Sequence, residues 1–176
     1  MSMQTLDLRI GACLQGEFSL ARVNVLLAFQ VNCPGCFLHA LPVATALHTH
    51  FPDSDVQVLG LSTVFEDFSL NTEEHTRQLL RDGQVVGETA KHLKTTGTDR
   101  YDTEIAFPVA MDAIGEDGVG QTFAINRFPG TPTWIVFGAD YTMHAAWFGH
   151  RDRTAVVRII DEALSRSQPT GPAPDS

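Results

Sequence analysis

An apolar segment followed at once by two closely spaced cysteines is the feature that most constrains this chain. Residues 23–30 (VNVLLAFQ) form a nearly continuous apolar run of strand length, which is typical of a strand buried on both faces of a sheet. Cys33 and Cys36 follow it, and apolar residues then recur at helical spacing up to His50. The sequence therefore predicts a buried strand, a cysteine pair in the next turn, and a helix that begins at this pair.

The remaining periodicity predicts alternating strands and helices. A second buried strand at 56–62 would complete a parallel β-α-β unit with the first strand and helix. Pro42 lies inside the first helix and is expected to bend it. Asn71 is expected to cap the next helix, with Glu74 as its reciprocal partner, and Gly83 is expected to end it. Further elements are expected at 86–94 (helix), at 107–112 (strand), at 133–137 and 141–148 (a hairpin), and after Asp152 as the cap of a final helix.

The length of the chain fits one domain with an ordinary hydrophobic core. We expect this domain at residues 1–167, because 176 residues lie within the usual range for one domain and can bury a core without disulfide staples. Residues 168–176 contain three prolines and are expected to form a disordered tail.

Charge and hydropathy argue against two classes of partner. The formal net charge of −9 would repel both nucleic acid and an anionic membrane surface. No apolar run approaches the roughly 18 residues that a membrane span needs, and the first residues do not resemble a secretory signal. We therefore expect a cytoplasmic protein without a nucleic-acid or membrane partner. In a reducing cytoplasm, a Cys-x-x-Cys pair is more often catalytic or metal-binding than a permanent crosslink.

The cysteine pair stands where helix chemistry can activate a thiol. Cys33 would occupy the cap position, and Pro34 the first helical position, where its missing N–H loses nothing. The free N–H groups of the helix start, which includes Gly35, and the positive end of the helix dipole favour a thiolate at Cys33. Cys36 would lie one turn further on the same face, close enough to attack a mixed disulfide formed at Cys33.

A zinc site is the alternative use of such a pair. Tetrahedral structural zinc requires four ligands, usually from a second Cys-x-x-Cys or from paired histidines. Only Cys13 and scattered histidines remain in this chain, so we expect no metal site. Cys13 itself is expected to be a small buried residue without a redox role.

Two motifs together resemble the thioredoxin superfamily, and the redoxin-type group within it most of all. They are Cys-Pro-Gly-Cys at 33–36 after a strand and Gly-Thr-Pro-Thr at 130–133 before a strand. The resemblance covers residues 22–166 and implies an α/β thioredoxin fold. This fold has a central mixed β-sheet of four or five strands flanked by helices, here with a helical insert after the second core strand. The resemblance also implies a cis bond before Pro132, which would pack beside the active disulfide and let Thr131 pair with an extended substrate.

The chain departs from the family in positions that matter for substrate contact and proton transfer. The family usually has Trp directly before the first cysteine, whereas this chain has Asn32, so the surface that meets substrates is expected to differ. The buried acid of thioredoxin is missing from the first strand. Proton transfer to and from Cys36 would then fall to His39, Glu66 or Asp67, although each is also of a type that commonly lies on the surface.

The resemblance implies a thiol–disulfide oxidoreductase without a cofactor, and we expect a disulfide reductase. Its substrate would be a disulfide-containing protein or small molecule, and a thiol or a reductase would supply electrons. A peroxiredoxin-type peroxidase is one alternative. That family shows Pro-x-x-x-Thr-x-x-Cys. Here Leu26 stands at the position of the proline and Gln30 at that of the threonine. A redox-inert scaffold that binds a partner protein is the other alternative.

Overall fold

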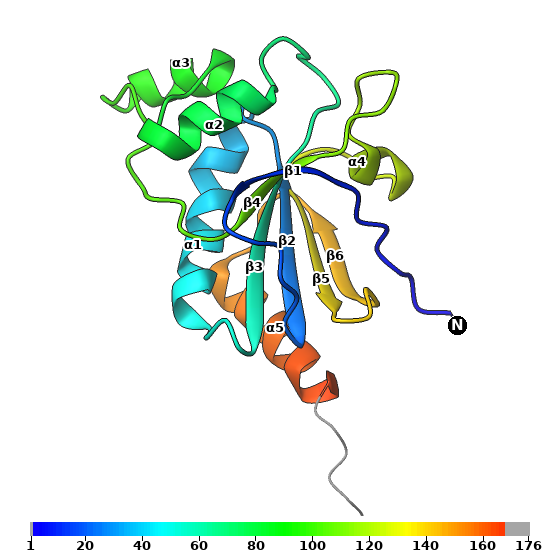
Figure 1. Cartoon of the computed structure of the whole chain (residues 1–176). Helices are drawn as coiled ribbons and strands as arrows, with labels where there is room; N and C mark the ends of the chain where they lie inside the picture. Colours follow the sequence, from blue (N-terminus) through cyan, green and yellow to red (C-terminus); the bar gives the residue numbers. More distant parts are fainter. Residues whose placement is uncertain (1, 168–176) are drawn as a thin grey trace, which may run out of the picture.

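A computed structural model describes residues 2–167 of the chain (Figure 1). The predicted tail at 168–176 lies outside the described residues. The described strands are β1 (Ile10–Gln15), β2 (Val23–Phe29), β3 (Val56–Ser62), β4 (Val109–Asp112), β5 (Thr133–Gly138) and β6 (Met143–Phe148). They form one mixed sheet in the order β1-β4-β3-β2-β5-β6. The central strand β2 is parallel to β3 and antiparallel to β5, and β5 and β6 form the predicted hairpin.

Six helical segments surround the sheet. They are η1 (Cys36–Ala40), α1 (Leu41–His50), α2 (Glu73–Asp82), α3 (Gly87–Thr95), α4 (Gln121–Ile125) and α5 (Arg153–Ser167). Helices α1 and α5 contact each other and pack on one face of the sheet. The N-terminal segment and α4 cover the other face (Figure 1). The mixed sheet flanked by helices, with α2 and α3 inserted after β3, confirms the predicted fold class.

Strand β2 is buried on both faces, as its sequence predicts. Val25 and Leu27 belong to the core under α1 and α5, whereas Leu26 and Ala28 belong to the core on the opposite face. All seven residues of β2 are buried. The strand therefore holds the following cysteine loop on a rigid base.

The sixth strand is not predicted by the sequence. Strand β1 pairs antiparallel with β4 at the edge of the sheet, and its register shifts on both sides of Cys13. Its residues are partly or fully exposed, and small residues in its sequence, IGACLQ, give no clean alternation of apolar and polar side chains. Cys13 is exposed on this edge, and the expectation that it is buried was wrong.

The start of α2 also differs from the prediction. Thr72, not Asn71, is the cap residue, and its hydroxyl accepts a hydrogen bond from the His75 N–H at 3.1 Å. Asn71 is buried, and its side chain bonds elsewhere. The end of the helix is as predicted, because Gly83 takes the left-handed conformation at the C-cap with φ of 77°.

Candidate active site

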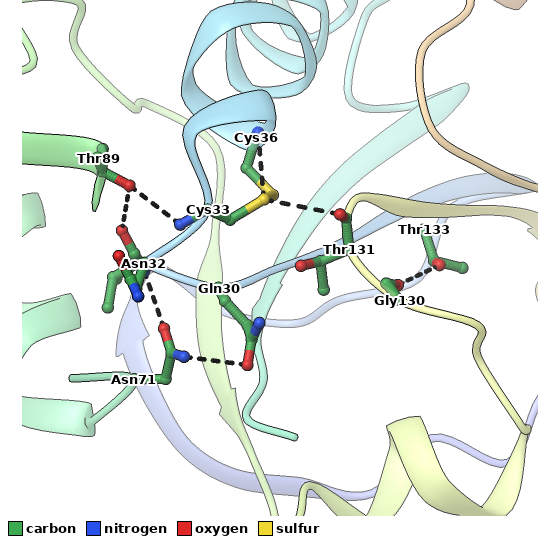
Figure 2. The surroundings of a disulfide bond; sticks show 10 residues. Gln30, Asn32, Cys33, Cys36, Asn71, Thr89, Gly130, Thr131 and Thr133 are labelled. Atoms are coloured by element: carbon green, nitrogen blue, oxygen red, sulfur yellow. Dashed lines mark hydrogen bonds between the residues drawn. A yellow bond between two sulfur atoms is a disulfide. The ribbon is translucent and has the colours of Figure 1, made fainter. Parts of the chain in front are cut away.

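The cysteine loop has the predicted geometry of a capped helix start (Figure 2). The helix begins at Pro34, directly after Cys33. The Cys36 N–H lies 3.0 Å from the Cys33 carbonyl oxygen and 3.3 Å from the Cys33 Sγ. Cys33 thus acts as the cap residue with a sulfur acceptor, which favours a thiolate on this sulfur in the reduced protein.

The two cysteines differ in exposure in the way that an attacking and a resolving thiol require. They form a disulfide, with their Cα atoms 5.3 Å apart. Cys33 is partly exposed, whereas Cys36 is 0% exposed. A substrate can therefore reach Cys33 and not Cys36.

The helix that follows starts with a π-helical segment. The Leu41 N–H donates to the carbonyl of Cys36, five residues earlier. Pro42, in the first turn of α1, cannot donate the backbone bond that a continuous α-helix requires. The bend expected at Pro42 stays a prediction, and the structure shows a wide π-helical turn that begins at Cys36 and ends two residues before this proline.

The loop before β5 comes close to Cys33. The Thr131–Pro132 peptide bond is cis, and the Thr131 carbonyl oxygen lies 3.6 Å from the Cys33 Sγ (Figure 2). The Gly149 N–H donates to the Pro132 carbonyl at 2.9 Å, which ties this loop to the end of β6. The two motifs, which are about 95 residues apart in the sequence, therefore meet at one site.

Comparison with solved structures gives two neighbours that share both the fold and part of the sequence. A thioredoxin-like superfamily protein is 26% identical, with a TM-score of 0.75, over 96% of this chain and 100% of the other. A thiol-disulfide isomerase from Corynebacterium glutamicum is 27% identical, with a TM-score of 0.74, over 93% of this chain and 97% of the other. The chain is a thioredoxin-like protein.

More distant neighbours agree in fold. A putative thiol:disulfide interchange protein DsbE from Chlorobium tepidum has a TM-score of 0.56 at 17% identity, over 93% of this chain and 99% of the other. No protein-family model and no curated protein matches the sequence. Together with the cysteine pair, the neighbours support thiol–disulfide redox chemistry for this thioredoxin-like protein.

Asn32, directly before Cys33, has a buried side chain, and the expected difference in the surface that meets substrates stays a prediction. The side chain of Asn32 is only 9% exposed and points into the protein. Its Oδ1 accepts the Glu88 N–H at 2.8 Å, and its Nδ2 donates to Asp67 Oδ2 at 2.8 Å. Its backbone N–H donates to Asn71 Oδ1 at 2.8 Å (Figure 2). Asn32 therefore joins the cysteine loop of this thioredoxin-like protein to the inserted helices.

The three candidates for proton transfer lie at different places around the loop. His39 is exposed and its ring packs at a tilt of 39° against that of His150, with ring centroids 4.6 Å apart. Asp67 accepts the hydrogen bond from Asn32, and Glu66 has an exposed side chain. Within residues 2–167, no hydrogen bond joins any of the three to Cys36. Their role in proton transfer stays a prediction.

Sequence reasoning missed two buried polar residues beside the motif. Gln30 is 1% exposed, and its Oε1 accepts hydrogen bonds from the Phe65 N–H at 3.0 Å and from Asn71 Nδ2 at 3.1 Å. Thr89 is 0% exposed, and its Oγ1 accepts the Cys33 N–H at 3.0 Å. A glutamine at the end of an apolar strand was a usable signal for the first residue. Nothing local to the sequence points to the second.

Neither a metal site nor a membrane span is found among residues 2–167. No three His, Cys, Asp or Glu side chains come together there in a way that could hold a metal ion. None of the helices described is long and apolar enough to cross a membrane.

Proposed function

We propose that this protein is a thiol–disulfide oxidoreductase that works as a disulfide reductase. The observation that carries the proposal is the pairing of a partly exposed Cys33 Sγ, held 3.3 Å from the Cys36 N–H, with a fully buried Cys36. A sulfur that caps a helix is favoured as a thiolate, and the thiolate is the attacking species in disulfide exchange.

The reaction has two exchange steps. The Cys33 thiolate attacks one sulfur of the substrate disulfide, whose S–S bond breaks, and the released substrate thiolate takes a proton from water. Cys36 then loses its proton to water and attacks the Cys33 Sγ, and the second substrate sulfur leaves as a thiolate that takes up a proton from water. The enzyme is left with the Cys33–Cys36 disulfide, and the substrate has gained two electrons. An external thiol or a reductase returns the enzyme to its dithiol form.

The loop with Thr131 supports binding of an extended peptide beside Cys33. Its carbonyl oxygen lies 3.6 Å from the Cys33 Sγ, at the place where a substrate disulfide would arrive. A backbone segment at that position can pair with a substrate strand in the manner of strand addition. The proposed substrate is therefore a disulfide in an extended segment of a protein, and a small disulfide would use the same sulfur.

A cytoplasmic location belongs to the same proposal. A dithiol reductase works where the compartment keeps thiols reduced, as the cytosol does. Exposed Cys13 would also stay a free thiol there.

Serine substitutions at the two cysteines test the proposal. In a Cys13→Ser background, Cys33→Ser is expected to abolish reduction of a protein disulfide, because the attacking sulfur is lost. Cys36→Ser is expected to accumulate a mixed disulfide with the substrate, visible as added mass that a reducing agent removes. The Cys13→Ser protein is the control and should keep full activity. Full activity in both motif variants would refute the proposal, and peroxide consumption far faster than that of free cysteine would favour the peroxidase alternative.

A further inference from the structure

The cysteine loop and the inserted helix α3 cap each other. The Cys33 N–H donates to Thr89 Oγ1 at 3.0 Å, and the Glu88 N–H donates to Asn32 Oδ1 at 2.8 Å. Thr89 and Glu88 lie in the first turn of α3. Each helix start therefore supplies an oxygen for a backbone N–H group of the other, and Figure 2 shows the bond between Thr89 and Cys33. We use the term reciprocal cap for these two hydrogen bonds.

In each half of the reciprocal cap, a side chain from the other segment supplies the oxygen that a local capping residue would usually supply. In a common capping motif, the third helical residue is Glu or Gln and accepts the N–H of the cap residue. Here Cys36 occupies that position, so Thr89 from α3 accepts the Cys33 N–H instead. On α3 the cap residue is Val86, which has no side-chain oxygen, and Asn32 supplies one.

Gly87 makes the close approach of the two helix starts feasible. Its φ of 55° lies in the region that favours glycine. A Cβ at this position would lie 2.4 Å from Asn32 Oδ1 and 2.9 Å from its Cγ. Any larger residue would therefore push the Asn32 side chain off the Glu88 N–H.

Thr89 fixes the backbone of the loop on both sides of Asn32. Its hydroxyl donates to the Val31 carbonyl at 2.9 Å while it accepts the Cys33 N–H. The hydroxyl is fully buried, so neither partner can exchange it for bulk water without local opening. This oxygen therefore helps to fix the position of Cys33, and so of its Sγ relative to the Cys36 N–H.

We propose that Thr89 is a positioning residue for Cys33, and that α3 sets the reactivity of the cysteine pair through the reciprocal cap. This inference rests on the proposed redox function. The hydroxyl of Thr89 holds the Cys33 Sγ on the N–H of Cys36, where a negative sulfur is favoured in the dithiol state. The disulfide state has no such charge to stabilise, so loss of the hydroxyl shifts the equilibrium toward the disulfide.

The test compares Thr89→Val with a matched control elsewhere in the protein. Thr122, in α4, is also 0% exposed, and its hydroxyl likewise accepts one backbone N–H and donates to one carbonyl, both of Arg9. Thr122→Val should therefore cost similar folding stability without touching the cysteine loop. Thr89→Ser keeps the hydroxyl. Gly87→Ala disturbs the hydrogen bond between Asn32 and Glu88, and leaves the side chains of Asn32 and Thr89 in place. All variants carry Cys13→Ser.

Two properties of the cysteine pair are measured in each folded variant. One is the equilibrium between dithiol and disulfide in glutathione buffers, and the other is the pH at which alkylation of reduced Cys33 is half complete. For Thr89→Val we expect the disulfide-to-dithiol ratio at a fixed buffer to rise about fivefold, as loss of one hydrogen bond would give. The alkylation midpoint is expected to move to higher pH. Gly87→Ala should change both in the same direction, whereas Thr89→Ser and Thr122→Val should match the parent protein.

Two results would overturn the inference. One is an unchanged equilibrium and midpoint in Thr89→Val or Gly87→Ala together with lowered stability, which would make the contact purely structural. The other is an equal shift in Thr122→Val, which would tie the effect to stability alone. Both differ from failure of the proposed function, in which the parent protein itself would show no reversible disulfide.

Discussion

Two backbone N–H groups of the cysteine loop depend on single side chains. The N–H groups of Asn32 and Cys33 donate to Asn71 and Thr89, whereas that of Cys36 has two acceptors, the carbonyl oxygen and the sulfur of Cys33. A buried N–H that loses its acceptor costs about 1–3 kcal/mol. At the scale of one residue, the geometry of the reactive sulfur therefore rests on a few oxygen atoms.

Tyr101 gives a prediction about pH. Its ring packs edge-on against Phe37, the residue after Cys36, with ring centroids 5.2 Å apart. Burial raises the pKa of Tyr101 from its ordinary value of 10.0 to about 12. Since the folded pKa lies above the unfolded one, the neutral phenol supports folding below pH 10, and this support is lost as the pH rises from about 10 to about 12.

Tyr101→Phe should remove this alkaline loss, because phenylalanine does not titrate. Urea denaturation at pH 9 and at pH 11 measures the free energy of unfolding of both proteins. We expect the parent protein to lose more stability between the two values than the variant does. Within residues 2–167 no partner meets hydrogen-bond geometry at the Tyr101 hydroxyl, and Thr103 nearby only offsets part of the rise in its pKa, so the variant should be at least as stable as the parent at pH 7. An equal loss in both proteins would show that other groups cause the alkaline dependence.

The inserted helices act at the scale of elements. Helix α2 begins at Thr72, and the residue before it, Asn71, bonds to the end of β2 and to the loop after β3. Helix α3 bonds to the cysteine loop itself. Figure 1 places both helices at the end of the sheet where α1 begins. The inserted helices therefore help to hold the cysteine loop in position.

Substitutions at two neighbouring residues distinguish the stability given by the cap of α2 from that given by the buried hydrogen bonds of Asn71. Thr72→Ala should cost about 1 kcal/mol, the usual value for loss of a helix cap. Asn71→Ala should cost more, about 2–4 kcal/mol, because the buried amide bonds to Gln30, Asn32 and Glu66. Urea denaturation of both variants gives the comparison. A cost for Asn71→Ala no greater than that for Thr72→Ala would contradict the network that the structure shows.

Local rules account for the parts of the site that the sequence could predict. The start of the helix at Pro34 follows from the preference for proline in the first helical position, and Cys33 as cap follows from it. His39 lies three residues after Cys36, which at regular α-helical spacing would place the two side chains near each other. However, the π-helical segment contains more residues per turn than an α-helix, and His39 is exposed while Cys36 is buried.

Contacts between distant segments account for what the sequence could not predict. Asn32 and Asn71 both have side chains that commonly form turns and caps. Local sequence rules do not predict the distant hydrogen-bond partners of either residue. Thr89 lies 56 residues after Cys33, and its hydroxyl reaches the loop only through the packing of α3. Cys13 was expected to be buried because free cysteines usually are, but it stands on the open edge of β1.

At the scale of the whole molecule, the sheet brings two distant motifs to one site. Strand β2 carries the cysteine loop, and its antiparallel neighbour β5 begins directly after the Thr131–Pro132 bond. The partners Ala28 and Thr133 stand at the adjoining ends of these strands. Because β2 is buried on both faces, the whole core holds this register. The site is therefore a product of the fold and not of either motif alone.

An equilibrium redox titration of the Cys33–Cys36 pair tests this account most directly. The titration uses the Cys13→Ser protein in buffers of defined potential, with dithiol and disulfide quantified by alkylation and mass. We expect one two-electron transition, closer to the roughly −270 mV of thioredoxin than to the roughly −120 mV of the strong oxidant DsbA. A potential near the second value would contradict the reductase direction. A pair that never forms a reversible disulfide would contradict the account of the protein as a thiol–disulfide oxidoreductase.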